Sequence, residues 1–158
     1  MKKLISIGYI FLSLLVVPNA LAADIPFNAS TVADLKNLYH GKKWLMVLWS
    51  VECPPCIKEL ALLEKLVDQN IDLPVVVINT DGDLSLYADR KDLISQFNLD
   101  SIKSYYFTDG QTEASRFLVD ASWFGELPRS YFFDEQGQSR GRSGLLSKNV
   151  IKQWLTIN

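Results

Sequence analysis

The sequence is poor in the side chains that most often bind metals. Its 158 residues include two cysteines, one histidine and two methionines. A structural zinc site in a protein needs four ligands, and Cys53, Cys56 and His40 are too few to supply them. We therefore expect no metal site and no bound cofactor.

Neither sign of charge is in large excess. The chain has 16 basic and 18 acidic residues, a formal net charge of −2, and no basic cluster stands out. Proteins that bind nucleic acid or an anionic membrane surface usually carry a basic patch. We expect no nucleic-acid partner. The chain also lacks internal repeats, low-complexity tracts and interdomain linkers, which favours one domain.

The longest apolar run, Leu4–Val17, is short for a membrane-spanning helix, which needs about 20 apolar residues. It follows a basic start and precedes the small residues Ala20–Ala23. This order is typical of a secretory signal peptide. We predict a signal peptide at 1–22 and a mature domain at 23–158 that is periplasmic or otherwise exported. The alternative is an uncleaved anchor, the one case in which membrane contact is expected.

Both cysteines lie in the stretch Val47–Leu60, separated by Pro54 and Pro55 and preceded by Glu52. Disulfides persist in exported proteins. A structural disulfide stabilises most when it closes a long loop, and this pair closes almost none. Redox exchange fits better, because one thiol can attack while its neighbour resolves the mixed disulfide. A structural bridge or a metal site is the alternative.

The flanks of the pair predict a strand followed by a helix. Lys43–Trp49 is nearly continuously apolar, as in a strand covered on both faces, and Ile57–Val67 has amphipathic helical spacing. The two prolines suit a first helical turn. Cys53 then lies at the helix N-terminus, where its thiolate is favoured, and is the expected attacking thiol. Cys56, one turn inside, is the expected resolving thiol.

The rest of the chain alternates helices and strands. We expect helices at Asn28–Tyr39 (capped by Ser30 or Thr31), Leu86–Asn98, Gln111–Asp120 and Ser147–Leu155, and strands at Leu73–Asn79, Tyr105–Phe107, Arg129–Asp134 and Ser139–Ser143. This order predicts an α/β domain with a mixed central sheet flanked by helices.

The motif Trp49-x-x-x-Cys53-Pro54-Pro55-Cys56 after a buried strand resembles the active site of the thioredoxin superfamily. Leu127-Pro128 is similar to the cis-proline position of that family, and Ser143–Leu155 to its C-terminal glycine turn and helix. Asp81–Asp109 resembles the insertion of the TlpA/ResA-like exported branch. The resemblance covers Ser30–Leu155 and implies a thioredoxin-like fold with a TlpA/ResA-type insertion in the middle.

The resemblance also implies a function. Several members of this branch are reductants that act on apocytochrome c thiols or on cysteines of copper-site proteins. For this chain, the resemblance implies a thiol–disulfide oxidoreductase whose redox-active Cys53–Cys56 disulfide is its only redox group. Its partners would be protein thiol or disulfide clients and a membrane or periplasmic electron donor. An oxidase-like or isomerase-like member, a copper-delivery protein and a non-catalytic binding module remain alternatives.

The branch typically carries a glutamate three residues after the second cysteine, and that position is Glu59. The resemblance implies that Glu59 tunes Cys56 or accepts its proton. The alternative is a solvated helix glutamate. The other supporting residues that we expect at the site are Trp49, Pro54, Pro55 and Pro128.

The chain departs from the family pattern at three positions. Val47 replaces a buried acid, Glu52 replaces an aromatic residue, and Arg129 replaces the threonine that often follows the cis-proline. Glu52 and Arg129 are expected to lie across the active site from each other. We also expect Glu52 and Glu59 to oppose the helix dipole, which would make the reduced pair a better electron donor. The residues that we expect to contact a substrate are Glu52, Trp123, Phe124, Leu127 and Arg129.

Overall fold

The structure is a computed structural model, and it describes residues 24–69 and 72–156. The predicted signal segment, 1–22, lies outside the described residues, so its cleavage stays a prediction. Within the described ranges, none of the helices combines the length and the apolar character needed to cross a bilayer.

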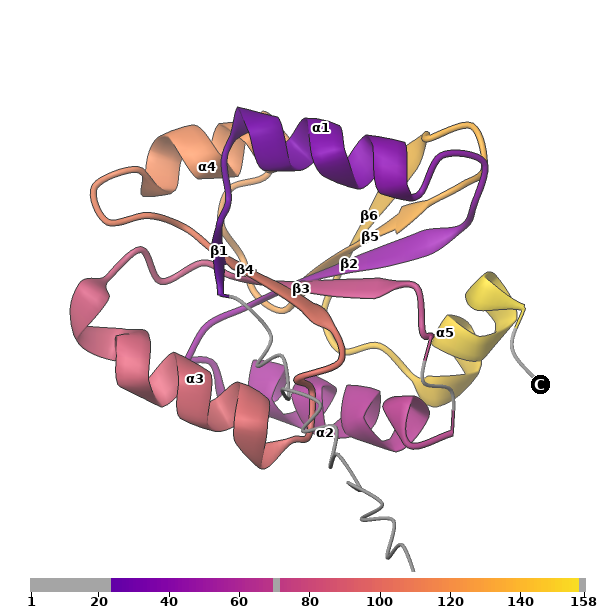
Figure 1. Cartoon of the computed structure of the whole chain (residues 1–158), viewed down its shortest axis with the longest axis horizontal. Helices are drawn as coiled ribbons and strands as arrows, with labels where there is room; N and C mark the ends of the chain where they lie inside the picture. The colour runs from indigo at the N-terminus through magenta and orange to yellow at the C-terminus, as the bar shows by residue number, and fades with distance from the viewer. Residues whose placement is uncertain (1–23, 70–71, 157–158) are drawn as a thin grey trace, which may run out of the picture.

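A six-stranded mixed sheet forms the middle layer (Figure 1). Its strand order is β1-β4-β3-β2-β5-β6. The first four strands in this order run parallel to one another, and β5 and β6 are antiparallel to their neighbours. The strands are β1 Ile25–Pro26, β2 Trp44–Trp49, β3 Val75–Asn79, β4 Lys103–Tyr106, β5 Arg129–Phe133 and β6 Ser139–Ser143. The predicted mixed α/β architecture is confirmed.

Helices cover both faces of this sheet. Figure 1 shows α1 and α4 on one face and α2, α3 and α5 on the other. The helices are α1 Ala29–Leu38, α2 Pro54–Val67, α3 Tyr87–Gln96, α4 Thr112–Val119 and α5 Lys148–Leu155, and a short 3-10 turn, η1 Leu84–Leu86, precedes α3.

The central strand β2 is apolar throughout because both of its faces are buried. Leu45, Val47 and Trp49 face the helices α2 and α5 in one buried cluster. The alternate residues, Trp44, Met46 and Leu48, lie in a second buried cluster on the opposite face. Because side chains alternate along a strand, a strand covered on both faces must be apolar throughout.

Two local expectations differ from the structure. The cap of α1 is Asn28, whose Oδ1 accepts hydrogen bonds from the N–H groups of Ser30 and Thr31. The prediction of Ser30 or Thr31 as the cap is wrong, because both residues already lie inside the helix. Strand β1 was not predicted, since two residues, one of them Pro26, give no alternating pattern.

The middle insertion adds one helix and one strand. Residues 81–109 contain η1, α3 and β4, and β4 lies between β3 and β1 in the sheet. Arg90 of α3 is 3% exposed and bonds Asp24 at 2.6 Å. Its guanidinium also lies 4.3 Å from the ring centre of Tyr106. The insertion therefore holds the segment that enters β1.

Candidate active site

The cysteine pair lies at the start of α2, at the carboxyl end of β2. Cys53 is the N-cap residue, and its Sγ accepts a hydrogen bond from the N–H of Cys56 at 3.2 Å. A disulfide joins the two residues, whose Cα atoms are 5.2 Å apart. Cys53 is half-buried, whereas Cys56 is fully buried. Of the two cysteines, only Cys53 is accessible to another molecule.

The two prolines reduce the number of free backbone N–H groups at the N-terminus of α2. Pro54 and Pro55 occupy the first two positions of α2, and proline has no N–H. The N–H of Cys56 is shared between the O and Sγ atoms of Cys53. In the reduced state this donor and the positive end of α2 would stabilise a thiolate on Cys53.

Asp81 anchors the loop that leads to Cys53. Its Oδ2 accepts hydrogen bonds from the N–H of Val51 at 3.0 Å and from Nδ2 of Asn79 at 2.7 Å. Trp49 and Asn79 are paired at the ends of β2 and β3. The polar side chains of Asn79 and Asp81 therefore lie beside the loop that follows β2. Asp81 was not among the predicted site residues. The available signal was the Asn-x-Asp sequence that begins at Asn79, the last residue of the buried strand β3.

Glu59 is a buried carboxyl one turn beyond Cys56. It is 1% exposed, and its Oε1 accepts a hydrogen bond from the N–H of Leu146 at 3.1 Å. Its Oε2 is buried and has no hydrogen-bond partner among the described residues. Burial raises its pKa from 4.5 to about 7, although the Leu146 hydrogen bond opposes this shift. The alternative of a solvated glutamate is wrong.

The segment before β5 brings the chain back to the end of the sheet where the cysteine pair lies. The Leu127–Pro128 peptide bond is cis and Pro128 is buried. Arg129 pairs with Leu48 of β2, so Pro128 lies at the end of β2 from which the chain runs to Cys53. Trp49 is fully buried in the same apolar cluster as Cys56, and Leu127 packs against that cluster. Pro128, Leu127 and Trp49 therefore all lie at the pair's end of the sheet.

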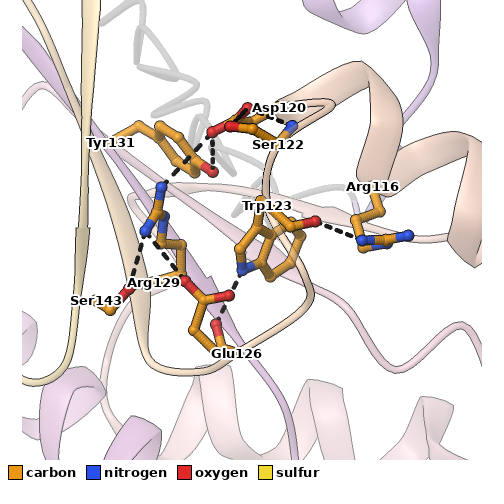
Figure 2. A network of polar contacts seen from close by, with 8 residues as sticks. All are labelled: Arg116, Asp120, Ser122, Trp123, Glu126, Arg129, Tyr131 and Ser143. Carbon is orange, nitrogen blue, oxygen red and sulfur yellow. Dashed lines mark hydrogen bonds and ion pairs between the residues drawn. The ribbon is translucent and has the colours of Figure 1, made fainter.

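Two of the five expected substrate contacts have internal partners instead. Trp123 is 2% exposed, and its Nε1 donates to the O of Glu126 at 3.0 Å. Arg129 donates through Nη1 to Oε1 of Glu126 at 3.1 Å and to Oγ of Ser143 at 2.9 Å. Figure 2 shows these side chains turned toward one another. The indole of Trp123 is not part of the molecular surface, and the charge of Arg129 is neutralised internally.

The carboxylates around Arg129 are held ionised. Hydrogen bonds from Ser122 come first among the causes that lower the pKa of Asp120. Burial alone would raise the pKa of Glu126, but hydrogen bonds, first that from Ser143, and the Arg129 charge hold it below its ordinary value. Oδ2 of Asp120 lies 3.6 Å from Nη2 of Arg129. Arg129 is thus paired with Glu126 and Asp120, and the expectation that Glu52 and Arg129 lie across the active site from each other stays a prediction.

The other three expected contacts remain at the surface. Glu52 is exposed, Phe124 is 92% exposed and Leu127 is half-buried.

Across residues 24–69 and 72–156, no three His, Cys, Asp or Glu side chains are grouped so that they could hold a metal ion.

No protein-family model and no curated protein matches the chain. Solved structures, in contrast, share its fold. A secreted disulfide oxidoreductase of Mycobacterium tuberculosis homologous to E. coli DsbE is 20% identical and has a TM-score of 0.58, over 76% of this chain and 84% of that one. StoA from Bacillus subtilis is 20% identical with a TM-score of 0.53, over 73% and 83% of the two chains.

A third similar structure carries the name of the fold. The exposed lipoprotein thioredoxin of Streptococcus pneumoniae is 23% identical with a TM-score of 0.55, over 77% of this chain and 88% of that one. These similarities, together with the sheet order and the position of the cysteine pair, support the resemblance seen in the sequence at the level of the fold. The chain has a thioredoxin-like fold.

Proposed function

We propose that this protein is an exported thiol–disulfide oxidoreductase that reduces disulfides in client proteins. The observation that supports this most directly is the Cys53–Cys56 disulfide at the start of α2, which joins one half-buried and one fully buried cysteine. The M. tuberculosis neighbour, named as a secreted disulfide oxidoreductase, gives independent support.

The reaction is a pair of sulfur displacements. In the reduced protein, the Cys53 thiolate attacks one sulfur of a client disulfide, and the other client sulfur leaves as a thiolate that takes up a proton. The Cys56 sulfur then attacks Sγ of Cys53, loses its proton and releases the second client thiolate. Two electrons reach the client and the Cys53–Cys56 disulfide re-forms. An upstream dithiol donor, periplasmic or in the membrane, must reduce the pair again.

Glu59 is the proton acceptor for Cys56 in this scheme. It follows Cys56 at i+3, so both side chains lie on one helix face. A pKa of about 7 is close to the pH at which an exported protein works, which is where a general base is most effective.

The same carboxyl favours reduction over oxidation of clients. A buried negative charge near the pair destabilises a thiolate, and a less stable thiolate makes the reduced form a better electron donor. By resemblance, clients are apocytochrome c or copper-site proteins. A redox titration of the pair against glutathione tests the direction, and a strongly oxidising potential would favour the oxidase-like alternative.

The roles of the two cysteines are tested by trapping. Cys56→Ser should accumulate mixed disulfides with clients, because Cys53 can still attack but nothing resolves the product. Cys53→Ser should accumulate few, since Cys56 is fully buried. Both variants are compared on non-reducing gels after acid quenching. The reverse pattern would contradict the assignment, and no trapped species from either variant would contradict the proposed function.

A further inference from the structure

Two neighbouring aromatic residues in the loop 120–127 differ sharply in exposure. Trp123 is 2% exposed and packs in the cluster beneath α1 and α4, whereas Phe124 is 92% exposed. A single exposed apolar side chain is normal on a protein surface, so its exposure alone says nothing about function. The contacts of this loop show that it is held firmly.

Hydrogen bonds along the loop fix its backbone. The N–H and Oγ of Ser122 both donate to Oδ1 of Asp120, at 2.8 and 2.6 Å. Nε1 of Trp123 donates to the O of Glu126, and Nη1 of Arg116 in α4 donates to the O of Trp123. In the sequence Phe124 lies between Trp123 and Glu126, two of the anchored residues that Figure 2 shows.

Arg129 ties the loop to the sheet. Its guanidinium contacts Asp120 and Glu126 from the loop and Ser143 at the end of β6. It also lies 4.8 Å from the ring centre of Tyr131 in β5. Gly141 of β6 leaves room for it, because a Cβ atom there would overlap the guanidinium. The exposure of Phe124 is thus imposed by contacts to two strands.

The loop ends at the same end of the sheet as the cysteine pair. Leu127 packs against the apolar cluster that includes Cys56, and Cys53 and Val51 pack against the same cluster. Phe124 lies three residues before Leu127 in the same loop, within reach of an extended client segment that passes Leu127 on its way to Cys53. A phenyl ring on a backbone that is already fixed can bury apolar area on binding without the entropy cost of ordering the loop.

We propose that Phe124 is a client-selecting contact for an extended protein segment that carries an apolar side chain next to its disulfide cysteine, and that Arg129 is the positioning residue that holds Phe124 in place. The inference rests on the proposed function and adds a class of client to it. Clients with only polar or charged neighbours around the disulfide gain nothing from this contact.

The experiment compares three disulfides as substrates of the reduced protein. Two are peptides that differ only in a leucine or a serine next to the cysteine, and the third is glutathione disulfide. The wild type should prefer the leucine peptide. Phe124→Ala should lower the leucine-to-serine ratio of kcat/KM about tenfold, the size expected when part of a phenyl ring is buried on binding. Phe124→Leu should restore much of that ratio.

Arg129→Met should also lower the leucine-to-serine ratio, mainly through KM for the leucine peptide, because Phe124 is no longer held. Leu84→Ala is the matched control, since Leu84 is 66% exposed on η1, outside the loop, and it should leave the ratio unchanged. Thermal unfolding of every variant separates a lost contact from a lost fold.

The outcomes distinguish the two proposals. An unchanged leucine-to-serine ratio in Phe124→Ala, or an equal loss on all three disulfides, would overturn the role of Phe124. A wild type that reduces all three disulfides without preferring leucine would overturn this inference alone. A wild type that reduces none of them would overturn the proposed function.

Discussion

At the scale of single residues, Glu59 is an acidic side chain held in the apolar interior of the domain. It is 1% exposed, only one of its two carboxyl oxygens has a hydrogen-bond partner among the described residues, and burial raises its pKa to about 7. A buried carboxyl of this kind lowers the stability of the fold when it is ionised. The residue proposed to accept a proton, Glu59, therefore also lowers the stability of the fold when it is ionised.

The first prediction follows from this pKa shift. Between pH 4.5 and about 7 the folded protein keeps a proton on Glu59 that the unfolded chain has lost. The folded state binds more protons in this window, so the free energy of unfolding should fall as pH rises and level off above pH 7. The loss is at most about 3–4 kcal/mol, because one pKa unit corresponds to about 1.4 kcal/mol.

Glu59→Gln keeps the hydrogen bond to Leu146 and should remove this pH dependence. Urea unfolding between pH 4 and 8 measures it. Glu64→Gln is the matched control, since Glu64 lies on the same helix but is only half-buried, and it should keep the pH dependence of the wild type. A flat profile in the wild type would contradict the prediction.

Glu52, the acid next to Cys53, is expected to have less influence than its position in the sequence suggests. It is exposed, and solvent and salt screen an exposed charge. Glu52→Gln should change the rate at which iodoacetamide alkylates reduced Cys53 by less than about twofold, and Glu59→Gln should increase it more, because a buried charge is screened less. A larger effect of Glu52→Gln would show that Glu52 tunes the pair.

At the scale of elements, β6 accommodates the side chain of Arg129. Gly141→Ala would place a methyl group inside the guanidinium, so Arg129 must leave its contacts with Glu126 and Asp120. We expect a loss of about 1–3 kcal/mol, as for overpacked sites in general, measured by urea unfolding. Ser139→Ala, on the same exposed strand, should change stability by less than about 0.5 kcal/mol. Equal effects of the two variants would contradict this role of Gly141.

Element by element, the sequence shows most of the fold and only part of the site. The apolar runs at β2 and β3 and the helical spacing of α2 are local patterns, so they predict the strand, the helix and the cysteines between them. The pairing of Arg129 with Asp120 and Glu126 depends on how the loop, β5 and β6 meet, and no local pattern contains it. The same holds for the burial of Trp123 and for the hydrogen bond from Leu146 to Glu59, because both depend on the tertiary structure. Leu146 and Glu59 are 87 positions apart in the sequence.

At the scale of the whole molecule, one buried ion pair joins the start of the described chain to the insertion. Asp24 and Arg90 are 12% and 3% exposed. Arg90→Met leaves the Asp24 carboxylate without its partner and should cost about 3–5 kcal/mol, as for broken buried pairs in general. The amide of Phe27, which bonds the O of Tyr106 at 2.8 Å, should exchange with solvent faster.

Calorimetry and amide hydrogen exchange measure these two effects. Lys91→Met is the control, because Lys91 is exposed on the same helix. The double variant with Asp24→Asn should regain part of the lost stability, since no unpaired charge is left. A double variant less stable than Arg90→Met alone would contradict the ion-pair explanation.

The order of the strands also determines how the sheet ends. At one edge, β1 has only two residues, too few to be a template for another strand. At the other edge, all five residues of β6 are exposed, and Arg140 and Arg142 project from it. Open edges with unpaired main-chain groups invite intermolecular pairing, and short strands and charged side chains discourage it. A second copy aligned along β6 would bring arginine near arginine, so the sheet is protected at both ends against growth into aggregates.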